Sequence, residues 1–308
     1  MKKIEIIVPV FNEFEVINEL VKKVNEVILL NQKKVELNLT IVDDGSSEDF
    51  ILMLKKLKKK NNFKLIELAK NSGQQIALRA GLDNSTSDAI IFMDADLQDP
   101  PNLISDMVTP WLKGHDVIHT VRTKREEETI FKRLTAFIFY RLANKHSEYE
   151  LTKNSGDFKL IDKTVVKNLK KNTDNELYVR GAIDFYSTNP YFIDYERQPR
   201  YSGKRKYKYK QSFNLAMSGL VSFSNFLPNF LIRSIFIFGL VFSLVFLYFL
   251  ISLQSFDYLE RGWASIMGML LFTNIVQLVS FLFIGTYLKK ITFQTSGREP
   301  YIIKNISE

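Results

Sequence analysis

A polar stretch at residues 94–99 carries the residue types for metal-assisted phosphate chemistry. It follows the apolar run Ile90–Met93, which is typical of a buried strand, and two prolines directly after it prevent that strand from continuing. Asp94 and Asp96 lie just past the strand end, where two carboxylates repel each other unless a cation lies between them. Such hard oxygen ligands suit Mg²⁺ or Mn²⁺, with bound phosphates as further ligands. We therefore predict a metal site at Asp94, Asp96 and Gln98.

Alternating strands and helices are predicted to position this stretch. Apolar runs predict strands at residues 4–10, 37–42, 63–68 and 90–93, later strands at 117–121 and 156–161, and a strand pair within 176–197. Helical spacing predicts helices at 17–28, 48–60 and 71–81. This order implies an α/β fold with a mostly parallel sheet and helices on both faces. In such sheets ligands bind beyond the carboxyl ends of the strands, where the polar clusters at 11–13, 43–47, 71–75 and 94–98 all fall.

The composition limits the class of protein. The chain has 308 residues, a net charge of +8 and no cysteine, which excludes disulfides and thiolate metal sites. Its three histidines have no metal-ligand spacing and are interpreted as surface or structural residues. Residues 200–210 hold six basic side chains and no acid. Such a patch is typical of nucleic-acid binding, but its position before hydrophobic segments favours anionic lipid headgroups or a phosphate. We expect a lipid bilayer as a partner and no nucleic acid.

Two long uncharged runs in the last third of the chain predict membrane-spanning helices. Residues 234–253 and 263–288 lack charged side chains and are long enough to cross a bilayer, and an amphipathic pattern at 212–227 suits a helix in the membrane interface. Basic residues lie outside the pair, so the positive-inside rule places the preceding domain in the cytoplasm. We predict a catalytic domain at 1–210, a juxtamembrane helix at 211–229, two spans within 230–290 (231–253 and 264–288) and a cytoplasmic tail at 291–308.

Several motifs together resemble one enzyme family. The segments that carry the resemblance are Val8–Glu13, Val42–Ser46, Asn71–Gln74, Asp94–Pro100, Gly156–Leu160, Arg197–Tyr207 and Arg298–Ile303. They resemble the family 2 glycosyltransferases, which have a GT-A fold. The whole chain is similar to the polyprenyl-phosphate branch, which contains the bactoprenol (undecaprenyl-phosphate) glucosyltransferases and the dolichyl-phosphate mannose synthases. The resemblance implies transfer of a hexose, with glucose as the default, from a UDP-sugar to undecaprenyl phosphate at the bacterial inner membrane, for cell-envelope glycan modification.

The predicted donor site uses the turns after the first strands. A proline and an aromatic residue after the first strand offer an apolar wall for a nucleoside. One of Asp43 or Asp44 can accept a hydrogen bond from the base or the ribose, and the resemblance favours Asp43 as the base contact. Gly73, at the start of a helix, suits the donor diphosphate or sugar. The predicted donor contacts are Pro9, Phe11, Glu13, Asp43, Asp44, Gly73 and Asp94.

The predicted acceptor site needs basic residues more than a strong base. A polyprenyl monophosphate has a second pKa near ~6 and is largely ionised at neutral pH, so the protein must hold a dianion beside another anion. Arginine suits bidentate phosphate contact. Asp157 orients the acceptor, completes the metal site, acts as a base or only makes structural hydrogen bonds, and these alternatives stay open. The acceptor candidates are Arg122, Lys132, Arg133, Arg200 and Lys204, and the catalytic candidates are Asp96, Asp157 and Arg122.

Other functions remain open from the sequence. The sugar can be glucose, N-acetylglucosamine or galactose. With any of them, attack of the lipid phosphate opposite the leaving diphosphate inverts the configuration of the anomeric carbon. A processive polysaccharide synthase would carry a Gln-x-x-Arg-Trp motif, and neither Trp111 nor Trp263 follows that pattern. The intact Asp94, Asp96 and Gln98 disfavour a non-catalytic membrane scaffold. Small and polar residues in the predicted spans are compatible with a homo-oligomer.

Overall fold

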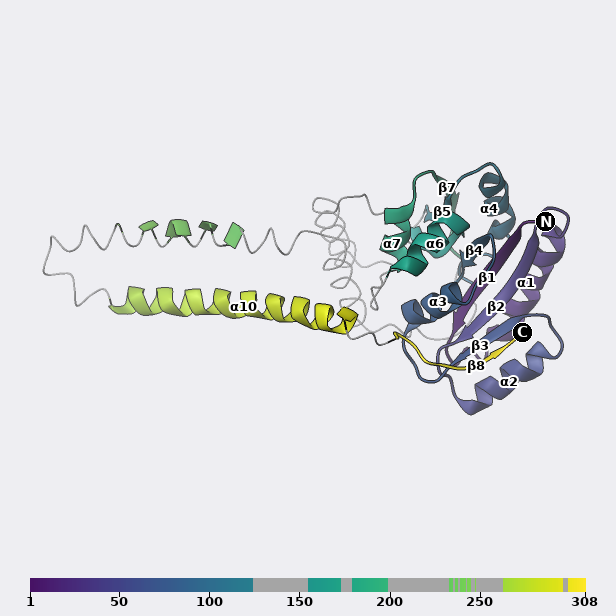
Figure 1. Ribbon diagram of the computed structural model, residues 1–308, viewed down its shortest axis with the longest axis horizontal. Coiled ribbons are helices and arrows are strands. Elements are labelled where there is room, and N and C mark those ends of the chain that lie inside the picture. Colours follow the sequence, from purple (N-terminus) through teal and green to yellow (C-terminus); the bar gives the residue numbers. More distant parts are fainter. Residues whose placement is uncertain are drawn as a thin grey trace, which may run out of the picture.

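The computed structural model describes residues 1–123, 155–172, 179–198, 263–295 and 299–308, together with scattered residues between 233 and 247 (Figure 1). Its strands are β1 (Lys3–Val10), β2 (Glu36–Asp43), β3 (Lys64–Leu68), β4 (Ala89–Phe92), β5 (Val117–Arg122), β6 (Ser155–Asp162), β7 (Pro190–Tyr195) and β8 (Ile303–Ser307). Its helices are α1 (Ile17–Asn31), α2 (Glu48–Lys58), α3 (Gln74–Asp83), α4 (Leu103–Leu112), α6 (Lys163–Lys171), α7 (Val179–Tyr186) and α10 (Trp263–Thr295).

One eight-stranded sheet, in the order β7-β5-β6-β4-β1-β2-β3-β8, forms the centre of the domain. β1 pairs in parallel with β2 and β4, β2 pairs in parallel with β3, and β5 pairs in parallel with β7. β6 and β8 run antiparallel to their neighbours. The prediction of a mostly parallel sheet is therefore confirmed, and the loops that follow β1, β2, β3 and β4 leave the same edge of the sheet.

Helices cover both faces of the sheet because the central strands are apolar on both sides. Ile6 and Val8 of β1 belong to the core under α1, α2 and α4. Ile7, between them, points to the opposite face and packs in the core with α3, α6 and α7. All three side chains are fully buried, and each such burial stabilises the fold by about 1.5–3 kcal/mol relative to exposure. A strand buried on both faces explains the continuous apolar run in the sequence.

Two segments differ from the sequence prediction. The strand pair predicted within residues 176–197 is wrong, because residues 179–186 form α7 and residues 190–195 form β7. Val179, Ala182 and Ile183 recur at helical spacing and pack together in the core. Residues 303–307, which the predicted tail included, form β8 and pair with β3 at the edge of the sheet. β8 thereby covers the open side of β3 and becomes the last strand of the sheet.

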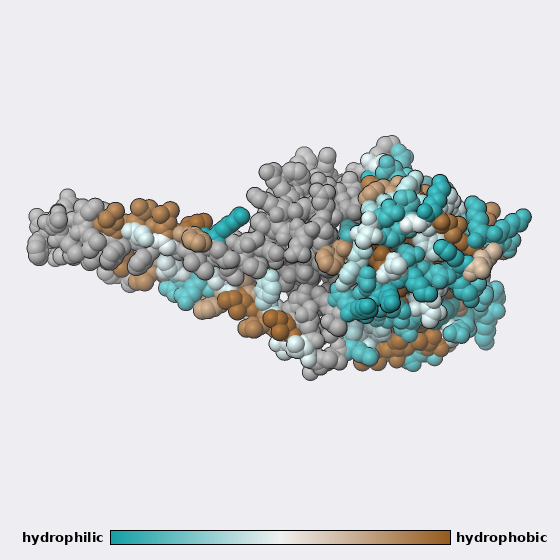
Figure 2. Space-filling view, turned by 45° about the horizontal axis from the view of Figure 1, so that its top comes forward, coloured by the Kyte–Doolittle hydropathy of each residue, from teal (hydrophilic) through white to brown (hydrophobic). Residues whose placement is uncertain are grey.

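α10 projects from the domain as a long helix with exposed apolar side chains. Phe272, Leu278 and Leu282 are each more than half exposed. Hydrophobic surface lies along this projecting arm, whereas the visible face of the domain is largely hydrophilic (Figure 2). Within the described residues, α10 is the one helix long and apolar enough to cross a membrane. The predicted juxtamembrane helix and most of the predicted first span lie outside the described residues.

Candidate active site

The loop after β4 holds the two predicted metal-binding carboxylates. β4 ends at Phe92, and Asp94 and Asp96 follow it at the edge of the sheet where the parallel strands end. The backbone N–H of Gln98 donates to Asp96 Oδ1 at 3.1 Å, and Leu97 between them has a φ of 57°. A positive φ at a branched residue costs on the order of 1–3 kcal/mol and is found preferentially at functional sites. The strained turn at Leu97 supports a functional role for this loop.

Gln74 joins Asp94 to Asp157. Its Nε2 donates to Asp94 Oδ1 at 2.7 Å and lies 3.5 Å from Asp157 Oδ2. Gln75 Nε2 also lies 3.5 Å from Asp157 Oδ2, and Gln75 Oε1 accepts from the backbone N–H of Val179 at 3.2 Å. The first two residues of α3 therefore bring together one carboxylate that follows β4, Asp94, and one that lies in β6, Asp157. Asp157 is 9% exposed, so its charge is poorly solvated.

These carboxylates create a site with the chemistry of a divalent-cation site. Burial, and after it the charge of Asp157, raise the pKa of Asp94 to about 8. A cation beside Asp94 and Asp96 would relieve this repulsion, and their oxygens are the ligands that Mg²⁺ and Mn²⁺ prefer. Among the described residues, no three His, Cys, Asp or Glu side chains form a complete ion cage. The site therefore fits an ion that takes further ligands from the phosphates of a bound donor.

The Gln98 side chain contacts the segment after β7. Its Nε2 donates to the Gln198 carbonyl oxygen at 3.4 Å, and the Gln98 carbonyl oxygen accepts from the Gln198 N–H at 2.9 Å. These bonds tie the loop after β4 to the end of β7. The metal-binding role of Gln98, which would use its Oε1, stays a prediction.

Two arginines meet at Asp99, next to the predicted metal ligands. Arg122, at the end of β5, places Nη2 at 3.7 Å from Asp99 Oδ2, and Arg197 places Nε at 3.4 Å from Asp99 Oδ1. The Tyr195 hydroxyl donates to Asp99 Oδ1 and accepts from Arg122 Nε at 3.1 Å. Arg197 Nη2 also lies 3.9 Å from Asp96 Oδ2. The structure thus places Arg122 within the site, beside a second arginine.

The loops after β1 and β2 are locked together by Asn12. Its N–H donates to Ser46 Oγ at 2.9 Å, and its Oδ1 accepts from the Ser47 N–H at 3.0 Å. A Cβ on Gly45 would lie 2.4 Å from the backbone carbon of Lys70, so glycine is required where this loop meets the one before α3. The predicted donor loops are therefore in direct contact.

The two aspartates at the end of β2 have different partners. Asp44 accepts from the N–H groups of Ser72 and Gly73 at 2.7 and 2.9 Å, so it positions the loop before α3. Asp43 Oδ2 accepts from the Ser46 N–H at 3.1 Å, while Asp43 Oδ1 is buried and has no hydrogen-bond partner among the described residues. Burial raises the pKa of Asp43. A buried acceptor of this kind suits a ligand N–H, which favours Asp43 over Asp44 as the base contact.

The other predicted donor residues lie around these loops. Pro9 is buried in β1 opposite Val42, and Phe11 and Glu13 are half-buried in the loop after β1. Gly73 was predicted to contact the donor diphosphate or sugar, and its N–H donates to Asp44. Gly73 therefore shapes the loop, and a direct contact between its N–H and a phosphate requires that bond to change.

Sequence reasoning missed four residues of the site. Gln74 and Asp99 lie within motifs that were recognised, but neither had an assigned role. Arg197 begins the motif segment Arg197–Tyr207, but it had no assigned role. Tyr195 carried no signal because its position depends on the pairing of β7 with β5. The predicted acceptor residues Lys132, Arg133, Arg200 and Lys204 lie outside the described residues.

A buried ionic cluster lies in the core between α7 and the strands β5 and β6. Lys159 is fully buried, with Nζ at 3.2 Å from Asp184 Oδ1. His119 Nδ1 lies 3.8 Å from the same oxygen, and its ring stacks on Phe192 with centroids 5.2 Å apart. Burial, and after it the charge of Lys159, lower the pKa of His119 to about 4. The interpretation of this histidine as structural fits these contacts.

Acidification from pH 6.5 to about pH 4 is expected to destabilise the fold through His119. The unfolded chain takes up the proton near the ordinary pKa of 6.5, whereas the folded chain does so at about 4. The contribution of neutral His119 to stability is therefore complete above pH 6.5 and is lost as the pH falls toward 4. The free energy of unfolding changes by roughly 3 kcal/mol over this range. Thermal unfolding in detergent, followed by the fluorescence of buried Trp111, measures it.

His119→Gln is expected to remove this part of the pH dependence. His115→Gln, in the segment before β5, is the matched control. Equal slopes of Tm against pH for the wild type and His119→Gln would contradict the assignment. A slope that His115→Gln also removes would show that another process is being measured.

The parallel sheet, the carboxylate pair after β4 and the joined loops after β1 and β2 define a GT-A glycosyltransferase. The model of glycosyl transferase family 2 matches residues 5–170, and the chain belongs to this family. The uncharacterized glycosyltransferase YkcC of Bacillus subtilis (strain 168) is 35% identical over 302 residues, which cover 97% of this chain and 92% of YkcC. The prophage bactoprenol glucosyl transferase homolog of Escherichia coli (strain K12) is 33% identical over 311 residues, which cover 99% of this chain and 100% of the relative.

Similar folds occur among solved structures. One is the mannosyltransferase PcManGT from Pyrobaculum calidifontis in complex with GDP-Man and Mn²⁺, with a TM-score of 0.46 and 17% identity. That match covers 66% of this chain and 58% of the length of the mannosyltransferase.

Proposed function

We propose that this enzyme transfers one hexose, with glucose as the first candidate, from a UDP-sugar to undecaprenyl phosphate, with inversion at the anomeric carbon. The relatives named bactoprenol glucosyl transferase support the lipid acceptor and the sugar. The product would be a polyprenyl-phosphate sugar for modification of the cell envelope. The reaction would take place at the cytoplasmic face of the bacterial inner membrane.

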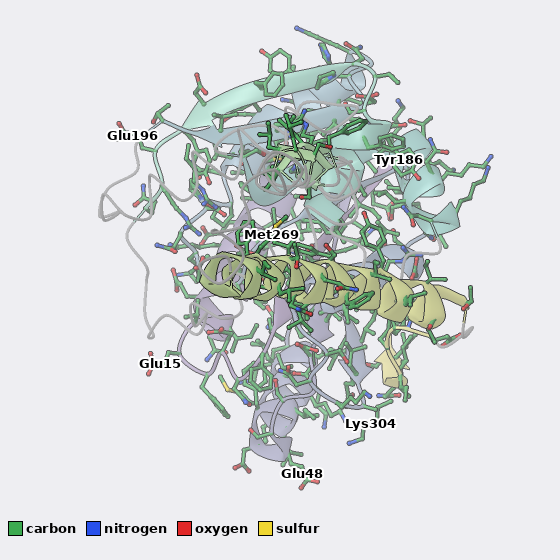
Figure 3. All side chains as sticks on the ribbon, turned by 90° about the vertical axis from the view of Figure 1, so that its left-hand side faces the viewer. Glu15, Glu48, Tyr186, Glu196, Met269 and Lys304 are labelled. Atoms are coloured by element: carbon green, nitrogen blue, oxygen red, sulfur yellow. The ribbon has the colours of Figure 1, made fainter. Side chains whose placement is uncertain are left out.

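One observation carries this proposal: a carboxylate pair and an arginine pair meet at the edge of the sheet that faces α10. The strands β1 to β4 are parallel, so their carboxyl ends share that edge. The N-terminus, where β1 starts, lies on the side of the domain away from α10 (Figure 1). Viewed from the side of α10, the helix stands in front of the domain, with Tyr186 and Glu196 on one side of it and Glu48 and Lys304 on the other (Figure 3).

The exposed apolar surface of α10 supports a membrane location. The stretch Gly268–Leu288 contains 21 residues, enough to cross a bilayer, and none of it is buried by the protein. A core helix of a soluble protein would be covered, because water does not favour a large exposed apolar surface. We therefore assign α10 as a membrane span.

β8 supports a second crossing. Ile303, its first residue, pairs with Leu68 at the carboxyl end of β3, so the chain returns to the catalytic domain after α10. A chain that leaves the domain and returns to it crosses the bilayer an even number of times. We assign the second crossing to the run predicted at residues 231–253. The basic residues that flank the two predicted spans support a cytoplasmic position of the domain.

The site residues divide the chemistry between donor and acceptor. Asp94 and Asp96 would hold Mg²⁺ or Mn²⁺, which as a Lewis acid neutralises the charge that develops on the leaving UDP. Gln74 fixes the position of Asp94 through the 2.7 Å hydrogen bond. Arg122 supplies a fixed positive charge for the acceptor phosphate. Because that phosphate is already ionised at neutral pH, the protein mainly aligns two anions.

Transfer of radiolabel from UDP-glucose, UDP-N-acetylglucosamine and UDP-galactose to undecaprenyl phosphate tests the proposal. We expect an organic-extractable product that requires Mg²⁺ or Mn²⁺, is formed best from UDP-glucose and carries one β-linked sugar. Absence of product with every donor would refute the enzyme function. A product with several sugars would instead indicate a processive synthase.

Asp43→Asn is expected to weaken UDP binding by about 10- to 100-fold, because the base loses a charged acceptor and meets an amide donor. Calorimetric titration with UDP measures this change. Asp49→Asn, which changes an exposed carboxylate in the first turn of α2, is the matched control and should bind UDP as the wild type does. Wild-type affinity in Asp43→Asn would show that Asp43 does not contact the nucleotide.

A further inference from the structure

The part of the chain that follows α10 returns to the sheet next to the predicted donor loops. β8 lies beside β3 and pairs with it in antiparallel orientation (Figure 1). Just before β8, the Ile302 carbonyl oxygen accepts from the Ala69 N–H at 2.8 Å. Ala69 is the first residue after β3 and begins the loop that leads to Gly73 and α3. A loop of the predicted donor site is therefore held by the chain that follows the membrane span.

Tyr301 connects this returning chain to α3. Its hydroxyl donates to Asp83 Oδ2 at 3.1 Å, and Asp83 is the last residue of α3. Arg79 Nε also donates to Asp83, at 3.0 Å to Oδ1 and 2.8 Å to Oδ2. The Tyr301 ring is partly buried against the core that contains α3. Because Gln74 at the start of α3 holds Asp94, Tyr301 fixes the far end of a helix that shapes the site.

Asn305 connects the same chain to the strand beside Asp43. Its Nδ2 donates to Glu67 Oε1 at 3.0 Å, and Lys55 Nζ lies 3.1 Å from the same oxygen. Glu67 is 1% exposed and is the partner of Asp43 in the pairing of β2 with β3. Burial, and to a smaller extent the charge of Glu67, raise the pKa of Asp43. The position of Glu67, which Asn305 helps to fix, therefore affects the predicted base contact.

A β-bulge allows this short segment to hold both faces of the sheet. The register of β8 shifts between Glu67 and Leu68, which makes Lys304 an extra residue. In a regular strand residues 301, 303 and 305 would all point to one face. Here Tyr301 packs against the core next to α3, whereas Asn305 reaches Glu67 on the face covered by α2. Bulges that redirect a side chain in this way are over-represented next to active sites.

We propose that residues 301–305 are a positioning segment for the donor nucleotide. Tyr301 and Asn305 hold α3, the loop before it and Glu67 in the arrangement that binds UDP, and neither side chain touches the nucleotide. This inference rests on the proposed function, and it adds a segment from the end of the chain to the donor side. Because the segment follows α10, the nucleotide site is coupled to the membrane span. By reciprocity, bound UDP must stabilise the docked segment.

Calorimetric titration of the full-length protein with UDP in detergent micelles tests this role. Asn305→Asp keeps the shape of the side chain but replaces the donor to Glu67 with a second carboxylate, so the two groups repel each other and β8 is loosened. We expect the dissociation constant for UDP to rise by about 10-fold. An unchanged UDP affinity in folded Asn305→Asp would overturn the proposal.

Asn38→Asp is the matched control for this variant. Asn38 Nδ2 also donates to a glutamate, at 3.2 Å to Glu36 Oε1, but the pair is exposed at the start of β2, away from the donor loops. Asn38→Asp should therefore bind UDP as the wild type does. Equal weakening in the two variants would reveal a general effect of charge and would overturn the positioning role.

Tyr301→Phe covers the case in which Asn305→Asp fails to fold. It removes the hydroxyl that donates to Asp83 and keeps the ring with its packing. We expect the KM for the UDP-sugar to rise by about 5-fold, with the KM for undecaprenyl phosphate within about 2-fold of the wild type. Tyr191→Phe, at an exposed position of β7 on the opposite edge of the sheet, is the matched control. An unchanged donor KM, or an equal rise of both KM values, would contradict the proposal.

Hydrogen exchange of the wild type measures the reciprocal effect of the nucleotide. Saturating UDP should slow amide exchange in β8 by about 5-fold or more, and by more than in β7, the strand at the other edge of the sheet, which reports any general stabilisation. Equal slowing in the two strands would overturn the proposal even if both variants misfolded. Failure of the wild type to bind UDP would refute the proposed donor and the inference with it. UDP binding with unchanged exchange in β8 would refute the inference alone.

Discussion

Asp96→Asn is expected to lower sugar transfer by about 1000-fold or more, because the proposed metal ion would lose a ligand, and with it several kcal/mol of transition-state stabilisation. Asparagine can still accept the 3.1 Å bond from the Gln98 N–H, so the turn at Leu97 should persist. The charge of the ligand is lost, and with it the affinity for the cation. Transfer to undecaprenyl phosphate and Mn²⁺ binding by electron paramagnetic resonance are the two measurements.

Asp106→Asn is the control for this prediction, since it makes the same chemical change at an exposed position of α4. Its activity and Mn²⁺ affinity should match those of the wild type. Thermal unfolding of Asp96→Asn should also match the wild type, which separates loss of the metal from loss of the fold. Full activity in Asp96→Asn would refute the metal role of this residue.

The sheet and its polar edge follow from the sequence because both depend on short-range patterns. The short apolar run at Ile90–Met93, followed by two prolines, is typical of a buried strand, and β4 occupies residues 89–92. Polar residues at the carboxyl ends of parallel strands must then share one end of the sheet, so the sequence alone predicts that Asp43, Gly73 and Asp94 lie in one region. The order of the elements and the direction of the strands are therefore enough to predict that these polar residues cluster.

Contacts between distant segments could not be predicted in the same way. Tyr195 and Asp99 are 96 residues apart, and their hydrogen bond exists because β7 pairs with β5 in one particular register. The choice between Asp43 and Asp44 depends on which carboxylate reaches the Ser72 N–H, which neither spacing nor composition determines. The sequence did not predict β8 because its pairing partner, β3, lies more than 230 residues earlier in the chain.

Asp157→Asn is expected to lower kcat by about 100-fold, the lower end of the range for loss of a positioned acid–base or orienting group. Asp157 lies in β6, 3.5 Å from the amides of Gln74 and Gln75, and an asparagine keeps its size. The proposed acceptor, a phosphate monoester, is already ionised at neutral pH, so the loss should be smaller than that for Asp96→Asn. Single-turnover transfer over a range of pH measures the effect.

Mn²⁺ affinity distinguishes a base or orienting role of Asp157 from a metal-binding role. The two roles predict changes in Mn²⁺ affinity of opposite sign in Asp157→Asn. The charge of Asp157 is the second cause, after burial, of the raised pKa of Asp94. Removing that charge lowers the pKa of Asp94, so less of it is protonated at neutral pH and Mn²⁺ should bind somewhat more tightly. If Asp157 were itself a metal ligand, Asp157→Asn would bind Mn²⁺ more weakly. If its role were only structural, kcat would fall in proportion to the loss of folded protein, and the folded remainder would show the same tighter binding of Mn²⁺ with an unchanged kcat per folded molecule.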